Sequence, residues 1–275
     1  MADYRSLELL HVDVADGVAT VVIDHPPVNL FDAAQMREFA QLGRMVESDD
    51  DVRVVVFRSA NPDFFIAHAD VGGILEIPAD LPPATKLSGF SGMVDRFRTM
   101  PKATIAVIEG RVGGGGSEFA LSCDMRFAAV GRAVFNQPEV GLGILPGGTG
   151  TQRLARLAGR SRALEIILGS DDFDAVTAER YGWVNRALPP EELWPFVDRL
   201  ARRIASFPPE AVAESKALVN LADGAIVDAI IAEQHGFNRL HPLPHVRARM
   251  ERFLEQGGQT PEGEQRLGDL VAEIG

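Results

Sequence analysis

Two apolar-rich runs open the chain, each with the length of a β-strand. They extend from Leu7 to Val14 and from Val18 to Asp24. Asp16-Gly17 lies between them, a residue pair typical of a tight hairpin turn, and Pro26-Pro27 ends the second run. The pattern therefore predicts a β-hairpin at the start of the fold.

A helical pattern follows the hairpin. Asp32 is suited to cap the helix, with Gln35 three residues later as its capping-box partner. Apolar side chains then recur at the three- and four-residue spacing of one helix face, at Met36, Phe39, Leu42 and Val46.

Strand and helix patterns continue to alternate up to about residue 150. The run Val52–Phe57 is typical of a buried strand, a helical segment is predicted from about Thr85 to Met100, and Thr104–Ile108 is again strand-like. Strands that alternate with helices indicate an α/β fold with parallel pairing, in more than one layer.

From about Thr149 onward the pattern is almost wholly helical. A clean amphipathic stripe covers Glu191–Ile204, and Phe207-Pro208-Pro209 interrupts the chain before three or so further helices. We place a boundary near Ser206, which divides the chain into a core, 1–206, and a helical C-terminal region, 207–275. A helical tail of this kind packs on its own core or on a neighbouring subunit.

Composition narrows the possible partners. The 275 residues carry a net charge of −12, which argues against nucleic acid or an anionic membrane surface. The chain has no 18-residue apolar run and no signal-peptide pattern, so we expect a cytoplasmic protein with no membrane partner. Its single cysteine, Cys123, is expected to be an inert buried thiol. Prolines interrupt the His241/His245 pair, so no metal site is predicted.

The most informative motif is GRVGGGGSEFALSCD, residues 110–124. Its glycines, Gly113 to Gly116, follow the strand Thr104–Ile108 and lead into a helix expected to begin near Ser117. Glycines at such a junction let backbone N–H groups approach a ligand, and a helix N-terminus favours negative charge. Because the carboxylate of Glu118 stands beside this anion-friendly backbone, the motif indicates enolate or oxyanion chemistry.

Two further motifs complete the pattern. FFIAHADV, residues 64–71, combines the small residues Ala67 and Ala69 with Asp70, a suitable helix cap. FNQPEVGLGILPGGTGTQRL, residues 135–154, places Glu139 before a glycine- and proline-rich loop. Each motif alone has an ordinary explanation: Glu118 as a complement to the helix dipole, and Glu139 as a solvated loop residue. The dinucleotide-binding fingerprint is excluded because Glu118 stands where it needs a glycine. The P-loop is excluded because the glycine-rich segments contain no lysine, and the nucleophile elbow is excluded because Phe119 stands where it needs a glycine.

In their order and spacing, these motifs resemble the crotonase superfamily, the enoyl-CoA hydratase/isomerase family. HPPVNLFD, residues 25–32, resembles that family's early Pro/Asn motif. The resemblance implies a spiral of ββα units, a helical C-terminal region that forms a homotrimer or a dimer of trimers, and an acyl-CoA substrate. CoA would arrive as part of that substrate, with no separate cofactor.

The resemblance also implies roles for individual residues. The backbone N–H groups of Ala69 and Gly115 match the oxyanion hole, where losing one donor typically costs about 3–4 kcal/mol. Glu118 and Glu139 match the catalytic pair, and two glutamates are typical of hydratases, in which the carboxyls hold one water. The remaining residues of the two motifs are expected to contact substrate: Ala67, His68, Asp70, Val71 and Gly114.

The chain departs from the family pattern at four places. The lysine that often follows the Ala-Asp motif is absent, since the chain continues with Val71-Gly72-Gly73. His68 replaces a glycine, which leaves open whether it narrows the pocket, adds a titratable group or points outward. One extra residue separates the glutamates, near Val130-Gly131. The tail 250–271 lacks the terminal motif that helps hold the adenosine end of CoA.

The leading prediction is an enzyme, a hydro-lyase that adds water across the 2,3 double bond of an enoyl-CoA or catalyses the reverse dehydration. The alternatives are another crotonase reaction, namely double-bond isomerisation, thioester hydrolysis or C–C cleavage, and a non-catalytic acyl-CoA-binding subunit.

Overall fold

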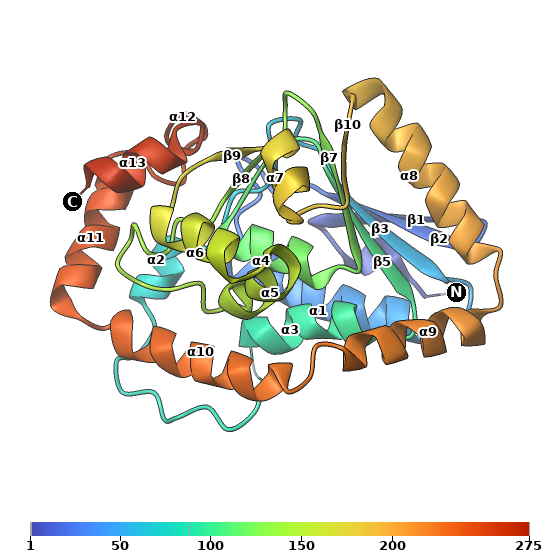
Figure 1. Cartoon of the computed structure of the whole chain (residues 1–275), viewed down its shortest axis with the longest axis horizontal. Helices are drawn as coiled ribbons and strands as arrows, with labels where there is room; N and C mark the ends of the chain where they lie inside the picture. Colours follow the sequence, from blue (N-terminus) through green and yellow to red (C-terminus); the bar gives the residue numbers. More distant parts are fainter. Residues whose placement is uncertain (1, 88, 275) are drawn as a thin grey trace.

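Two β-sheets form the centre of the molecule, and helices cover their faces (Figure 1). The structure is a computed structural model, and it describes residues 2–87 and 89–274.

The larger sheet has six strands in the order β1-β2-β3-β5-β7-β10. β1 and β2 form the predicted antiparallel hairpin, and Asp16 and Gly17 make its turn with φ of 52° and 79°. The other neighbours in this sheet pair in parallel. The six strands are β1 Leu10–Ala15, β2 Val18–Ile23, β3 Val54–Ser59, β5 Ala103–Ile108, β7 Met125–Ala129 and β10 Arg186–Leu188.

The smaller sheet has the order β4-β6-β8-β9. Each of its first three strands directly follows a strand of the larger sheet, so that β3/β4, β5/β6 and β7/β8 are successive pairs, each followed by a helix. This repetition is the predicted spiral of ββα units. The strands are β4 Phe64–Ile66, β6 Arg111–Gly113, β8 Val134–Asn136 and β9 Phe173–Asp174.

Helices cover the larger sheet on both faces. Helix α8, Pro190–Ala205, buries its predicted apolar stripe against one face (Figure 1). On the other face α1, α3 and α4 enclose a cluster of edge-to-face phenylalanine rings, centred on Phe39, Phe57, Phe97 and Phe119. Asp32 caps α1 as predicted, because its carboxylate accepts a hydrogen bond from the Gln35 N–H at 2.8 Å.

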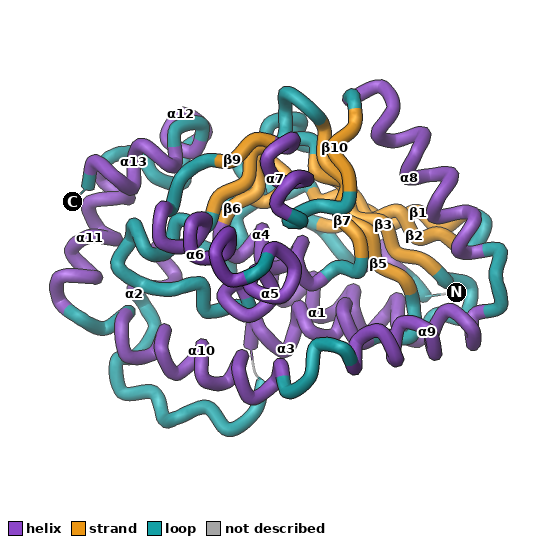
Figure 2. The backbone as a smooth tube through the Cα atoms, viewed as in Figure 1, coloured by secondary structure: helices purple, strands orange, loops and turns teal. Residues whose placement is uncertain are grey.

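The C-terminal helices α10 to α13 lie beyond α2 and α5, on the side of the molecule away from α8 (Figure 2). No helix in the described part of the chain is long and apolar enough to cross a bilayer. The helices are η1 Tyr4–Ser6, α1 Ala33–Ser48, α2 Val71–Leu75, α3 Gly89–Thr99, α4 Gly114–Ser122, α5 Gly150–Ala158, α6 Arg160–Gly169, α7 Ala175–Tyr181, α8 Pro190–Ala205, α9 Pro209–Leu221, α10 Ile226–Leu240, α11 Pro244–Glu255, α12 Pro261–Glu264 and α13 Leu267–Glu273.

Several predicted boundaries were wrong. The helix expected near Ser117 begins at Gly114, inside the glycine run, and the one expected from Thr85 begins at Gly89. The segment after Thr149 is less uniformly helical than predicted, since β9 and β10 occur within it. These strands have two and three residues, too few for a period-two pattern to be visible.

Candidate active site

The glycine run packs directly against the segment Ile66–Ala69. A Cβ added at Gly116 would lie 2.3 Å from the carbonyl oxygen of Ile66, and one at Gly113 would lie 2.7 Å from that of Ala67. Only glycine permits this approach of two backbones. The run therefore has a packing role as well as the ligand role proposed from its sequence.

The two predicted oxyanion donors meet at this contact. A Cβ on Gly115 would lie 3.3 Å from the backbone nitrogen of Ala69, so any side chain at 115 would crowd that N–H. Gly115 is the second residue of α4, where an N–H has no acceptor within the helix, and no side chain caps this helix. Within residues 2–87 and 89–274, the Ala69 N–H donates to no acceptor.

Glu118 lies one turn into α4, and its side chain is buried. Its Oε1 accepts hydrogen bonds from the backbone N–H groups of Gly148 and Gly150, both at 2.8 Å. These two residues belong to the glycine-rich loop that sequence analysis singled out. The loop has a definite task here, since it fixes the orientation of the Glu118 carboxyl group.

Glu139 is also buried, contrary to the ordinary explanation of a solvated loop residue. It follows β8 in a turn closed by hydrogen bonds from the Leu142 and Ile144 N–H groups to its carbonyl oxygen. A Cβ on Gly114 would lie 3.0 Å from Oε1 of Glu139, which places this carboxyl beside the start of α4. Its Oε2 is buried and has no partner among the described residues.

Both carboxyl groups hold protons more firmly than a free glutamate. Burial, followed by the charges of Glu139 and Glu233, raises the pKa of Glu118 well above its usual value. Burial raises the pKa of Glu139 to about 7, although the charge of His68 opposes this shift. The site thus keeps at least one proton near neutral pH, as an acid–base pair requires.

The other predicted substrate contacts have local partners of their own. Ala67 donates its N–H to the Val28 carbonyl at 3.1 Å, and Gly114 begins α4 with φ of 43°. Asp70 caps α2, and the Val71 N–H donates to the Gln259 side chain at 2.6 Å. The His68 ring points toward the C-terminal helices, where it meets Glu264. Contact of these residues with substrate stays a prediction.

Two further residues of the site were not predicted from the sequence. Glu233, on α10, is buried and accepts hydrogen bonds from the backbone N–H groups of Thr149, Thr151 and Gln152. Phe90, on α3, lies over Glu118 and the donors: its ring is 3.5 Å from the Cβ position of Gly115 and 2.5 Å from that of Gly148. Glu233 stands in the apolar stripe of α10, a misplaced charge that could have drawn attention.

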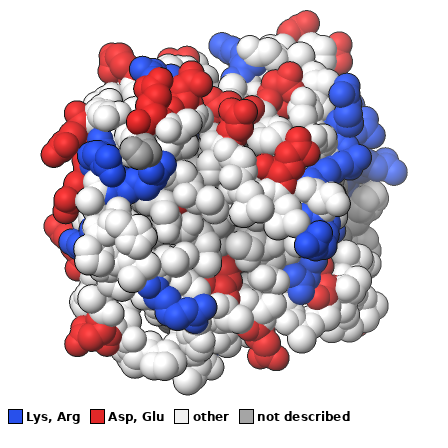
Figure 3. Space-filling model, turned by 60° about the vertical axis from the view of Figure 1, so that its left-hand side comes forward, with Lys and Arg blue, Asp and Glu red and all other residues white. Residues whose placement is uncertain are grey.

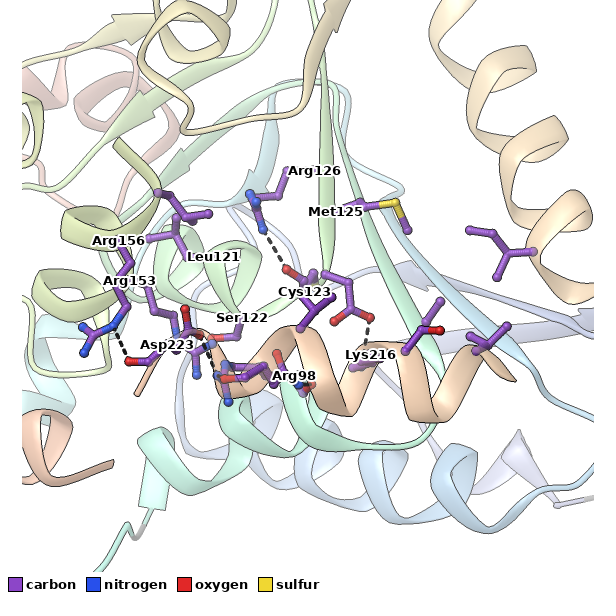
Figure 4. A pocket seen from close by; sticks show the side chains of 18 of the residues that line it. Arg98, Leu121, Ser122, Cys123, Met125, Arg126, Arg153, Arg156, Lys216 and Asp223 are labelled. Atoms are coloured by element: carbon purple, nitrogen blue, oxygen red, sulfur yellow. Dashed lines mark hydrogen bonds and ion pairs between the residues drawn. The ribbon is translucent and has the colours of Figure 1, made fainter. Parts of the chain in front are cut away.

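A separate pocket of about 740 Å³ opens between α4 and α9 (Figure 4). It contains none of the four candidate catalytic groups, and carboxylates pair with several of its cations, among them Arg98 with Asp223 at 2.6 Å and Lys216 with Asp124 at 2.8 Å. Cys123 is buried as expected, and burial raises the pKa of its thiol to about 12. Among the described residues no His, Cys, Asp and Glu side chains cluster in a group that could hold a metal ion.

Two buried carboxyl groups beside two free N–H donors define the class of site. The donors can stabilise negative charge that develops on a carbonyl oxygen, and the carboxyls can move protons at neighbouring atoms.

Comparison with known proteins identifies the family that carries this chemistry. The sequence profile of the enoyl-CoA hydratase/isomerase family matches residues 13–263.

Individual relatives agree over nearly the whole chain. The short-chain-enoyl-CoA hydratase of Clostridium acetobutylicum is 33% identical over 87% of this chain and 92% of its own length. The crotonyl-CoA hydratase of Syntrophomonas wolfei is 33% identical over 90% and 96%. A Streptomyces avermitilis crystal structure, provisionally assigned as an enoyl-CoA hydratase, superposes with a TM-score of 0.88 at 38% identity, covering 97% and 98% of the two chains.

This chain belongs to the enoyl-CoA hydratase/isomerase family and has the crotonase fold. It is an enzyme of that family, of the hydro-lyase type.

Proposed function

We propose that this enzyme adds water across the 2,3 double bond of a short-chain enoyl-CoA, and catalyses the reverse dehydration. The observation that carries the proposal is the burial of Glu118 and Glu139 together, next to the free N–H groups of Ala69 and Gly115. The names of the Clostridium and Syntrophomonas relatives support the choice of a short acyl group.

The arrangement accounts for the chemistry in one sequence of events. The thioester oxygen accepts hydrogen bonds from the Ala69 and Gly115 N–H groups, which stabilise the enolate that forms when water attacks C3. One carboxylate takes a proton from the water, and the other carboxyl delivers a proton to C2. Glu118 and Glu139 are the pair for these transfers, and the ring of Phe90 supplies an apolar wall beside them.

Glutamine substitutions test the proposal, because they keep the shape of each side chain and remove its proton chemistry. We expect Glu118→Gln and Glu139→Gln each to lower the hydration rate of crotonyl-CoA by about a hundredfold or more. Unfolding temperature measures whether the fold survives. Glu191→Gln, at an exposed position of α8, is the matched control.

Product mass separates hydration from the other reactions of the family. Hydration adds the mass of one water to the acyl-CoA, isomerisation leaves the mass unchanged, and hydrolysis releases free CoA. Stabilisation by acyl-CoA without turnover indicates a binding subunit. Full activity in either glutamine variant overturns the assignment of the catalytic pair.

Assembly and location complete the proposal. We expect a homotrimer or dimer of trimers formed through the C-terminal region 207–275, and a cytoplasmic enzyme with no cofactor beyond the CoA of its substrate. Helix α8 ends at Ala205, next to the predicted boundary at Ser206.

On the face shown in Figure 3, Lys and Arg side chains gather in separate groups near the edges, and uncharged residues cover the middle.

A further inference from the structure

Two departures from the family pattern, 196 positions apart, meet in the structure. His68 stands where the resemblance implies the usual glycine, and Glu264 lies in the tail that lacks the usual terminal motif. Nε2 of His68 is 2.9 Å from Oε1 of Glu264, and both side chains are almost fully buried, with 4% and 1% exposed. A single buried pair therefore links the two changes.

The hydrogen bonds around this pair define its charge. Nδ1 of His68 is 2.7 Å from the carbonyl oxygen of Ala69, which can only accept, so Nδ1 carries a hydrogen. Nε2 faces the Glu264 oxygen that also accepts from the Gln259 N–H at 2.7 Å. Burial alone would lower the pKa of His68, but the Glu264 carboxylate raises this pKa overall. Both ring nitrogens face acceptor oxygens, so the geometry favours an imidazolium paired with a carboxylate.

Gln259 adds a second link between the same segments. Its Oε1 accepts from the Val71 N–H at 2.6 Å, and its Nε2 donates to Asp70 Oδ1 at 2.9 Å. Gln259 has φ of 69°, in the left-handed region that a side chain rarely adopts without fixed partners. The C-terminal segment 259–264 therefore holds His68, Asp70 and Val71, the residues on both sides of Ala69.

We infer that His68, Glu264 and Gln259 form a latch by which the C-terminal segment orients the Ala69 N–H toward the substrate oxygen. They are positioning residues: a bridge from Phe31 holds the same backbone, since its N–H donates to the His68 carbonyl and its carbonyl accepts from the Asp70 N–H, and the latch adds the side-chain hydrogen bonds to Ala69, Asp70 and Val71. The inference rests on the proposed function for its kinetic consequence, and it assigns a task to His68 and to two residues of the divergent tail.

Two single variants test the latch from opposite sides. Gln259→Gly removes both side-chain hydrogen bonds and suits the positive φ, so the backbone should keep its path. His68→Gly removes the ion pair and restores the family's residue. We expect each variant to lower kcat for crotonyl-CoA about tenfold or more, with KM changed less than kcat, because a misplaced donor weakens transition-state binding.

A double variant and an activity-independent measurement complete the test. With His68→Gly already present, Glu264→Ala should lower kcat by a smaller factor than it does in the wild-type background, since only one of its two partners, the Gln259 N–H, is left to lose. Hydrogen exchange of the backbone amides in residues 66–75 should be faster in all these variants. Glu262→Ala is the matched control, because Glu262 lies on the same short helix and is exposed.

The outcomes separate the latch from the proposed function. The latch would be overturned if the losses of kcat from His68→Gly and Glu264→Ala multiplied in the double variant. It would also be overturned if the backbone amides of Gln259→Gly exchanged hydrogen at the wild-type rate. If the variants have a lower unfolding temperature but an unchanged kcat, these residues only stabilise the fold, and the latch is overturned. If the wild-type enzyme fails to hydrate crotonyl-CoA while exchange still responds to the variants, the function is wrong and the latch stands.

Discussion

At Gly115, packing and chemistry require the same residue. An added Cβ would lie 3.2 Å from the Cβ of Ala69 and 3.3 Å from its nitrogen, next to the N–H that we assign to the oxyanion hole. A methyl group there would push the two donors apart. It would not harm the helix itself, since alanine favours helix formation over glycine by about 1 kcal/mol.

Gly115→Ala is therefore expected to lose activity while the fold is retained. We predict a fall in kcat for crotonyl-CoA of about a hundredfold, the usual effect of losing one oxyanion donor, with little change in unfolding temperature. Gly169→Ala is the control, because an added Cβ there meets nothing within 4 Å. Wild-type kcat in Gly115→Ala would remove Gly115 from the proposed site.

The pKa values of the glutamate pair predict the pH dependence. Burial raises the pKa of Glu139 to about 7, and burial together with the charges of Glu139 and Glu233 raises the pKa of Glu118 well above its usual value. With the pKa of Glu118 raised, Glu139 is the carboxylate of the pair, and its protonation below pH about 7 removes the base, so kcat/KM should fall toward acid. At higher pH both ionise, no acid remains, and the rate should fall again.

A pH–rate profile with a short enoyl-CoA measures both limbs. The residual activity of Glu139→Gln should show no fall of kcat/KM near pH 7, because glutamine does not titrate. A profile that is flat between acid and neutral pH would contradict the assignment.

Among the elements, helix α10 acts on the site from a distance through Glu233. This carboxylate accepts from three N–H groups at the start of α5, where Thr149 has φ of 102°. The same stretch of backbone provides the Gly148 and Gly150 N–H groups that hold Glu118. Glu233 thus fixes a strained turn whose other side orients a catalytic candidate.

Glu233→Gln tests this dependence. An amide offers one acceptor oxygen where the carboxylate offers two, so at least one buried N–H would lose its partner. We expect the free energy of unfolding to fall by about 1–3 kcal/mol and kcat to fall about tenfold. Denaturant unfolding and crotonyl-CoA hydration measure the two effects, and Asp228→Asn, exposed on the same helix, is the control. A stable variant with normal kcat would contradict the role.

The success of sequence analysis at this scale depended on how local each signal was. The hairpin turn at Asp16-Gly17, the Asp32 cap and the α8 stripe depend on neighbours within a few residues, and the structure confirmed all three. The ββα spiral was predicted through the resemblance of ordered motifs, and it too was confirmed.

Long-range partners could not be predicted in this way. Glu233 meets Thr149 across 84 positions, and His68 meets Glu264 across 196. Only the folded chain brings them together, since local periodicity does not specify which buried polar groups pair with each other. The burial of Glu139 likewise does not follow from its own loop, because its surroundings come from α4 and α10 as well.

At the scale of the whole molecule, α9 lacks a cover for its apolar side chains. Leu218, Val219 and Leu221 are 57%, 71% and 72% exposed. Several large apolar side chains exposed close together on one helix are typical of a surface that contacts another chain. Their position in the region 207–275 agrees with the assembly proposed above.

Light scattering after size-exclusion chromatography measures this assembly directly. We predict that the wild-type chain elutes as a trimer or hexamer, and that Val219→Glu with Leu221→Glu shifts it toward monomer, because two charges would be desolvated at the interface. Val176→Glu, at a 40% exposed position on α7, is the control. If the double variant stays fully assembled, α9 lies outside the interface. If it dissociates and loses activity while its unfolding temperature is unchanged, catalysis depends on the assembly.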